Sequence, residues 1–185
     1  GHLDICQYLL QMDDVDANIK SCNNERTPLH WAARNGHLNI CKLLVLDYNV
    51  PVDTLAKGDV TPLELAIWQC HLTTAKYLVE KLDANPHHPN SWGCTTAHWL
   101  GKCAITDNVE LLEEACDWLF GICKVEYNTP NHHGQTPLHK AAYAGNHIVA
   151  KYLVLQLGVI DNIRDNQGNN AADCAERSQN YELAK

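Results

Sequence analysis

The chain has 185 residues, of which 45% are hydrophobic and 19% charged, so it is long enough to bury a core and too apolar to be disordered. The 14 basic residues are outnumbered by 22 acidic ones, and the formal net charge is -8. Because nucleic acids and anionic membranes attract an excess of Lys and Arg, this charge argues against both as partners, although net charge alone does not describe a local basic patch.

Residues 1–21 open with Gly-His-Leu-Asp-Ile-Cys, and a close match, Gly-His-Leu-Asn-Ile-Cys, returns at residues 36–41. We expect residues 1–21 to be the second helix and trailing loop of a helical repeat whose first half is absent, which leaves an apolar face exposed. Since the chain also begins without methionine, we interpret it as a fragment of a longer array. No signal peptide opens the chain, and its longest clear apolar run, residues 43–46, is far too short to cross a membrane.

Nine cysteines are a high and odd number, and none of them forms a Cys-x-x-Cys pair. Cys6 and Cys41 hold the same place in the two matching segments, which indicates a small apolar packing residue at a repeated position. A disulfide framework is typical of small secreted chains instead. The cysteines of this longer chain therefore favour a reducing, intracellular setting, and we expect the cytoplasm.

A four-residue motif recurs in phase along the chain. Thr-Pro-Leu-His at residues 27–30 is followed by Thr-Pro-Leu-Glu at 61–64, Thr-Thr-Ala-His at 95–98 and Thr-Pro-Leu-His at 136–139, with a weak copy, Asn-Ala-Ala-Asp, at 170–173. Successive copies start 34, 34, 41 and 34 residues apart. Near-equal steps of this length are typical of repeat proteins, in which each repeat is one supersecondary unit.

Each copy of the motif predicts two short helices. Threonine is a good helix N-cap and proline fits the first helical position, so a first helix is expected to begin after Thr27 and to end at Gly36, where glycine adopts a left-handed C-cap at low cost. Apolar residues then recur with helical spacing over residues 38–44, and again over 72–79 and 148–154. Because neither helix can bury its apolar face alone, the pattern predicts an all-α solenoid of stacked helix-turn-helix units.

These segments resemble the ankyrin repeat, in which Thr-Pro-Leu-His, a pair of alanines, Gly-His and an apolar second helix are joined to the next repeat by a hairpin turn. The resemblance covers nearly the whole chain and implies that the motif Thr and His form hydrogen bonds within and between repeats. It gives this structural role to Thr27, His30, Thr61, Thr95, His98, Thr136 and His139. Glu64 and Asp173 depart from the motif, and we expect weaker bonding between repeats there. Cys70 replaces the glycine that ends the first helix, which predicts a turn that is either strained or differently closed.

We expect a single ankyrin-type array over residues 1–185. Its predicted parts are a partial repeat at 1–21, full repeats at 22–55, 56–89, 90–130 and 131–164, and a degenerate, polar C-terminal repeat at 165–185. The third full repeat is seven residues longer than its neighbours, and the insertion lies at 104–115. Here Asp107 and Glu110 resemble a capping box that opens the second helix. We interpret the insertion as a tolerated surface loop or as a projection that contacts a partner.

Ankyrin arrays bind through their hairpin tips and the exposed, concave face of their first helices, so the resemblance also implies partner-binding positions. They are Arg26, Arg34, Asn35, Lys57, Trp68, Gln69, Trp92, Lys102, His132, His133, Gln135 and Tyr143. Trp68, Trp92 and Tyr143 are the strongest candidates, because binding energy concentrates on large aromatic side chains and arginine. The alternative is that these rings pack on a neighbouring loop. We assign Trp31 and Trp99, which follow the motif histidine, to packing.

Eleven histidines beside nine cysteines raise the question of a metal site. No stretch offers the three or four converging ligands that zinc requires, so we expect neither a metal nor a cofactor. Cys94 and His98 resemble a nucleophile and its base, but the family motif gives His98 a structural role, and no third orienting group is evident. We therefore expect no catalytic residue and no enzymatic activity.

Three functional hypotheses follow from these residues. The first is a monomeric interaction module that binds a protein partner through the hairpin tips and the first helices. The second is a regulatory or targeting segment of a larger enzyme, such as a kinase or a ubiquitin ligase subunit. The third, a redox- or metal-responsive protein, depends on the Cys and His counts alone. The fold does not name the partner, because many unrelated functions share such scaffolds.

Overall fold

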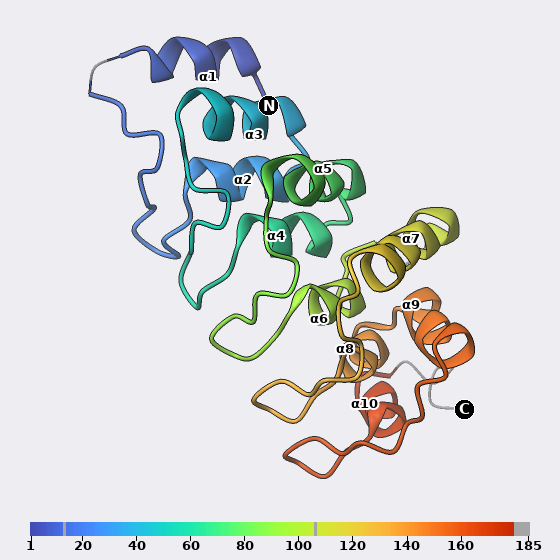
Figure 1. Cartoon of the computed structure of the whole chain (residues 1–185). Helices are drawn as coiled ribbons and strands as arrows, with labels where there is room; N and C mark the ends of the chain where they lie inside the picture. Colours follow the sequence, from blue (N-terminus) through green and yellow to red (C-terminus); the bar gives the residue numbers. More distant parts are fainter. Residues whose placement is uncertain (13, 106, 180–185) are drawn as a thin grey trace. The chain divides into compact units, whose positions relative to one another are not determined.

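The computed structural model describes residues 1–12, 14–105 and 107–179. Outside the described residues lie 13 in the predicted partial repeat, 106 in the predicted insertion and 180–185 in the predicted C-terminal repeat. The described residues form helices joined by turns and loops, with no strand among them, which confirms the predicted all-α fold (Figure 1). The chain divides into two compact units, Gly1–Asn85 and Pro86–Lys185.

The first unit stacks its helices in pairs. Its elements are α1 (Leu3–Leu10), α2 (Pro28–Arg34), α3 (Leu38–Lys42) continuing into a π-helical segment η1 (Leu43–Asp47), α4 (Pro62–Trp68) and α5 (Leu72–Leu82). The first helices α2 and α4 lie side by side, and among the second helices α3 packs between α1 and α5 (Figure 1). Fully buried leucines fill the space between them, namely Leu29, Leu44, Leu63, Leu65 and Leu78.

The second unit repeats this arrangement. Its elements are α6 (Thr96–Gly101), α7 (Val109–Cys116) continuing into η2 (Asp117–Ile122), α8 (Pro137–Ala144), α9 (His147–Lys151) continuing into η3 (Tyr152–Gln156), and α10 (Ala171–Arg177). The first helix α8 packs between α6 and α10, and the second helix α7 packs against α9. The fully buried core of this unit contains Leu100, Leu112, Trp118, Leu119 and Leu153.

The turns that follow α2, α4 and α8 share a left-handed backbone. Gly36 and Gly145 have φ angles of 70° and 71°, and Cys70, in the same place after α4, has a φ of 54°. Glycine adopts this conformation freely, whereas the Cβ atom of any other L-residue is crowded by the backbone. Cys70 therefore carries the backbone strain that its replacement of glycine predicts.

A neighbouring ring also closes the space around Gly36. A Cβ atom built on this residue would lie 2.6 Å from Nδ1 of His71, just before α5. Gly36→Ala is expected to lower the free energy of unfolding by about 1–2 kcal/mol or more, because left-handed strain is added to a steric clash. Urea unfolding followed by tryptophan fluorescence measures the loss.

Gly121→Ala is the matched control for this change. Apart from its chain neighbours and the adjacent helix backbone, nothing lies within 4 Å of the Cβ position at Gly121, and its φ is not in the left-handed region. Its free energy of unfolding is expected to stay within about 0.5 kcal/mol of wild type or to rise. An equal loss in both variants would contradict the steric explanation for Gly36.

The second helix of the long third repeat begins differently from its prediction. Its N-cap is Asn108, whose side-chain oxygen accepts a hydrogen bond from the Leu111 N–H at 3.1 Å. The predicted capping box of Asp107 and Glu110 is therefore wrong, because the next side chain along already satisfies the helix start. The insertion lengthens both the loop before α7 and the helix, in which eight residues of α7 run into six of η2, against five and five in α3 and η1.

Helix α1 leaves its apolar side chains exposed. None of its residues is buried, and Ile5, Tyr8 and Leu9 expose 51%, 65% and 45% of their surfaces. This confirms the exposed apolar face predicted for residues 1–21. Among the described helices, α1 packs mainly against α3.

Candidate functional site

A histidine in the motif ties its own helix to the next repeat. In the first full repeat, Nδ1 of His30 accepts a hydrogen bond from the Thr27 N–H at 3.1 Å, so Nε2 carries the proton and donates to the carbonyl oxygen of Val60 at 2.9 Å. The same contacts are made by His98 with Thr95 and Gln135, and by His139 with Thr136 and Asn169. Each of these histidine clamps joins neighbouring repeats through a main-chain oxygen.

Burial keeps two of these imidazoles neutral. His30 and His98 are 0% and 2% exposed, and the loss of hydration lowers the pKa of each to about 4. The hydrogen bond to the next repeat opposes this shift, whereas the positive charges of Arg26, near His30, and Lys140, near His98, add to it. A neutral ring suits the clamp, because Nδ1 has to accept while Nε2 donates.

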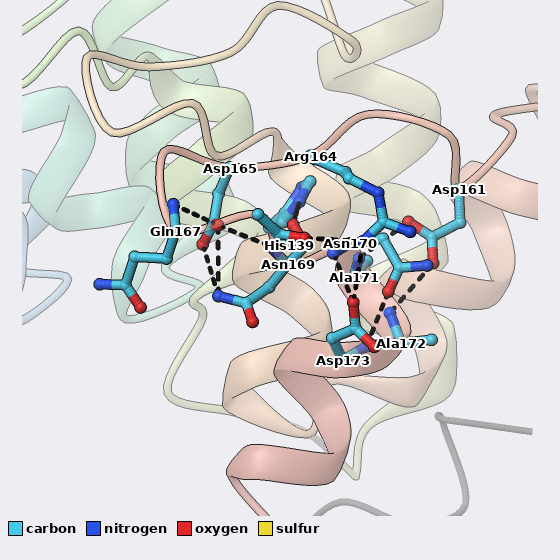
Figure 2. A network of polar contacts seen from close by, with 11 residues as sticks. His139, Asp161, Arg164, Asp165, Gln167, Asn169, Asn170, Ala171, Ala172 and Asp173 are labelled. Carbon is cyan, nitrogen blue, oxygen red and sulfur yellow. Dashed lines mark hydrogen bonds and ion pairs between the residues drawn. The ribbon is translucent and has the colours of Figure 1, made fainter.

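Two motif positions carry a carboxylate where the others have histidine. Glu64 is fully buried and accepts a hydrogen bond from the Thr61 N–H at 3.0 Å, which preserves the cap within its repeat. In the last repeat, Asp173 accepts from the Asn170 N–H at 3.0 Å and from Arg164 at 3.3 Å (Figure 2). Weaker bonding between repeats stays our prediction at both positions.

Main-chain hydrogen bonds join the hairpin tips of neighbouring repeats. In the first unit, the Lys57 N–H donates to the Asn24 carbonyl at 2.9 Å. In the second unit, the His132 N–H donates to the Trp92 carbonyl at 2.9 Å. Within each unit the tips are thereby held in register, so the side chains that they carry keep fixed positions beside the first helices.

In the first unit, two arginines and two tryptophans form a stack beside helix α2, which we call the Arg–Trp stack. The guanidinium groups of Arg26 and Arg34 lie 5.1 and 5.6 Å from the ring centre of Trp31, and that of Arg34 lies 5.4 Å from the ring centre of Trp68. These are cation–π distances. Among the described residues, neither arginine has a carboxylate within ion-pair distance.

In the second unit, a pocket of about 310 Å³ lies between two hairpin tips and the helices α6 and α8. We call it the Trp92–Lys140 pocket. It is lined by Asn90, Trp92, Cys94, His98, Trp99, Lys102, Asn131, His133 and Lys140. Two lysines and two tryptophans thus face one cavity, and no aspartate or glutamate is among its lining residues.

A family model described as ankyrin repeats in three copies matches residues 1–90 and 100–185. This chain belongs to the ankyrin repeat family. Ankyrin repeats are generally protein-binding, and by themselves they are not catalytic. The family therefore agrees with the repeat motif, with the paired helices and with the histidine clamps between neighbouring repeats.

Relatives of this ankyrin chain differ widely in size and description. It is 29% identical to the palmitoyltransferase AKR1 of Lachancea kluyveri and 28% identical to the NAD-dependent deacetylase sir2B of Dictyostelium discoideum, over 83% and 79% of the chain. It spans only about a fifth of the length of these two proteins, 20% and 19%. It is 26% identical to the probable 26S proteasome regulatory subunit p28 of Saccharomyces cerevisiae, over 95% of this chain and 75% of that protein.

Every predicted partner-binding residue of the ankyrin units reaches the surface at least in part. Exposed are Asn35, Lys57, Trp92, Lys102, His132, His133 and Tyr143, and half-buried are Arg26, Arg34, Trp68, Gln69 and Gln135. The Arg–Trp stack brings together Arg26, Arg34 and Trp68, and the pocket brings together Trp92, Lys102 and His133. The remaining predicted residues belong to neither group.

Several members of these two groups are missing from the predicted partner-binding set, and three of them share one position in the repeat. Trp31, Trp99 and Lys140 hold the same position in their ankyrin repeats, one residue after the motif histidine. The sequence assigns both tryptophans to packing, whereas Trp31 exposes 40% of its surface and lies between two arginines. The available signal is the recurrence of a large or charged side chain at this position in three of the repeats.

Within the described residues, no group of three or more His, Cys, Asp and Glu side chains is placed to hold a metal ion. No described helix is long and apolar enough to cross a membrane. Burial raises the pKa of the Cys41 thiol to about 12, so this side chain stays protonated at neutral pH. A protonated thiol is a poor nucleophile and does not favour a redox role for this residue.

Proposed function

We propose that this chain is a protein-interaction module that binds a protein partner through its hairpin tips and the exposed side chains of its first helices. The observation that carries the proposal is the Arg–Trp stack, which presents Trp31 between two guanidinium groups at the surface of the first unit. Tryptophan and arginine dominate the binding energy of protein interfaces. The proposed contact residues are the partner-binding set predicted from the sequence together with Trp31, Trp99 and Lys140.

The geometry of the stack supports binding at a low entropic cost. Each arginine already lies over a ring, so less side-chain freedom is lost when a partner covers it. The hairpin tips are held in register by their main-chain hydrogen bonds, which adds further preorganisation. The net charge of -8 supports a protein in preference to nucleic acid or an anionic membrane.

A pull-down with matched variants tests the proposal. We compare the wild-type chain with Trp31→Ala/Trp92→Ala/Tyr143→Ala, which removes three side chains exposed by 40%, 46% and 62%. At least one protein in a lysate of the source cells is expected to be retained by wild type and depleted at least tenfold by the variant, because truncation at an interface hot spot costs about 2 kcal/mol or more.

The control variant removes exposed apolar side chains from the second helices instead. Ile122→Ala/Leu155→Ala changes residues of η2 and η3 that are 71% and 73% exposed, and it is expected to retain the same proteins as wild type. Circular dichroism and thermal melting verify that all variants fold. Equal retention by wild type and the triple variant, or loss in the control alone, would refute binding through the first helices and tips.

A second candidate function is a regulatory or targeting segment of a larger enzyme. It is favoured by the similarity to a palmitoyltransferase and a deacetylase, in which the matched segment is 20% and 19% of the protein. In that case the surface formed by the hairpin tips and first helices would regulate or target a catalytic domain in the same polypeptide. The sequence of the full-length transcript distinguishes the two candidates.

We further propose a monomeric array in an intracellular, cytoplasmic setting. The nine cysteines all lie in described residues and form no disulfide bond with one another, which suits a reducing compartment. The similarity to a proteasome regulatory subunit supports the same setting.

A further inference from the structure

Two ammonium groups converge on the Trp92–Lys140 pocket. Lys140, on helix α8, is half-buried, and its Nζ donates a hydrogen bond to the neutral side-chain oxygen of Gln135 at 2.7 Å. Lys102 follows helix α6 directly and is exposed. Neither lysine forms an ion pair with a carboxylate among the described residues. The pocket therefore holds positive charge without a counter-charge of its own.

The electrostatics of Lys140 reflect this arrangement. Burial is the largest cause that lowers the pKa of Lys140, and the positive charge of Lys102 lowers it further, although Cys94 and Cys174 oppose the shift. A half-buried ammonium group is costly unless an acceptor or an opposite charge compensates its lost hydration. An anion placed between the two lysines would supply charge-assisted hydrogen bonds to both.

We propose that the Trp92–Lys140 pocket binds the carboxylate of an aspartate or glutamate side chain in a segment of the protein partner. Lys102 and Lys140 donate to the carboxylate, and the exposed ring of Trp92 covers the apolar stem of the same side chain. The inference rests on the proposed function, because it specifies the chemistry of the partner segment that the interaction module binds.

The size and composition of the pocket favour a carboxylate over a larger anion. Its volume of about 310 Å³ is at the small end of ligand pockets, and it contains no guanidinium group that would form a two-pronged contact with phosphate. The chain as a whole has a net charge of -8, so an acidic segment is repelled by most of the surface. The two lysines of the pocket give such a segment a defined point of attachment, which helps to fix its register.

Nuclear magnetic resonance titration with defined peptides tests the inference. The probe is an N-acetylated, C-amidated peptide of six glutamates, and the matched probe replaces each glutamate with glutamine. The indole N–H signals of Trp92 and Trp99 in the ¹⁵N-labelled chain are expected to shift with the glutamate peptide and to stay in place with the glutamine peptide. Inorganic phosphate at the same charge concentration is expected to shift them less than the glutamate peptide.

Lysine variants separate the pocket from general charge attraction. Lys102→Gln/Lys140→Gln is expected to bind the glutamate peptide at least about tenfold more weakly, because each charge-assisted contact is lost. Lys151→Gln, which removes an exposed lysine from helix α9 of the same unit, is expected to bind like wild type. Since Lys102 is exposed, Lys102→Gln alone serves if the double variant does not fold, and an affinity loss of at least about threefold is then expected.

Each other result overturns the carboxylate assignment. It fails if the glutamine peptide shifts the indole signals equally, if the pocket variant binds as tightly as wild type, or if phosphate shifts the signals more strongly. If the pull-down still finds a partner that the triple variant does not retain, such a failure refutes only the binding of an acidic side chain in the pocket. The proposal that the chain is a protein-interaction module is then still supported. When the glutamate peptide binds as expected but no partner depends on the triple variant, the pocket stands and the proposed function fails.

Discussion

The free energy of unfolding is expected to fall by about 3 kcal/mol for each of His30 and His98 when the pH is lowered from 7 to 4. Both rings are buried and have a pKa of about 4, against the ordinary value of 6.5 in the unfolded chain. Between these two values the unfolded chain binds a proton that the folded chain excludes. The two histidines lie in different units, so both units are expected to be weakened by acid.

The direction of this effect follows from the lowered pKa of a base. The stabilisation by a neutral histidine is complete above pH 6.5, declines as the pH falls through that value, and levels off below about 4. The Asp165 carboxylate affects stability in a lower pH range. Burial raises the pKa of Asp165, but the hydrogen bonds from Asn169 and Gln167 outweigh burial and hold this pKa below the ordinary value of 3.8. The contribution of Asp165 to the free energy of unfolding is therefore lost only as the pH falls further.

Urea unfolding at a series of pH values between 7 and 4 measures the effect. His30→Gln is the informative comparison, because glutamine cannot be protonated, and the variant is expected to lose the His30 share of the pH dependence while starting from a lower stability at pH 7. His2→Gln changes an exposed histidine and is expected to follow the wild-type curve. A stability that stays constant between pH 6.5 and 4.5 would show that the clamp rings are hydrated.

Replacing the motif leucine with alanine is expected to be strongly destabilising in either unit. Leu29 and Leu138 are 0% and 5% exposed, and each lies between its own helix and the neighbouring pair. Leu29→Ala in the first unit and Leu138→Ala in the second are expected to cost about 2–5 kcal/mol each, because lost burial is added to a cavity that the neighbours fill only in part.

Denaturant unfolding of the two leucine variants, with the slope of the transition compared with wild type, provides the measurement. Leu155→Ala removes the same atoms from a side chain that is 73% exposed, so its stability is expected to change by no more than about 0.5 kcal/mol. Similar values for the buried and exposed leucines would mean that the motif leucines do not belong to the core.

The fold is well predicted by the sequence because each repeat carries its own local signals. Thr27 caps a helix and Gly36 ends one through interactions within a few residues, so they can be recognised without a three-dimensional context. The recurrence of these signals at a fixed spacing then implies the stacking of repeats. Where two good capping residues stand next to each other, as at Asp107 and Asn108, the local signal does not distinguish them, and only the structure identifies Asn108 as the N-cap.

The candidate site is less predictable, because both the Arg–Trp stack and the pocket are completed by side chains from a neighbouring repeat. Trp31 and Trp99 each follow the motif histidine of their own repeat. Trp31 is nevertheless 40% exposed beside two arginines, whereas Trp99 lines a pocket. The difference depends on the side chains that the adjacent hairpin and helix supply. Lys140 contributes to the pocket because Lys102 and Trp92 come from the repeat before it, which no local pattern encodes.

The histidine clamps have a consequence for how such a chain can change over time. Their acceptors belong to Val60, Gln135 and Asn169, three side chains with little chemistry in common, because the clamp uses the main-chain oxygen alone. A mutation at an acceptor position therefore leaves the bond between repeats intact and alters only what the hairpin presents to its surroundings. The scaffold and its specificity can evolve separately, one repeat at a time.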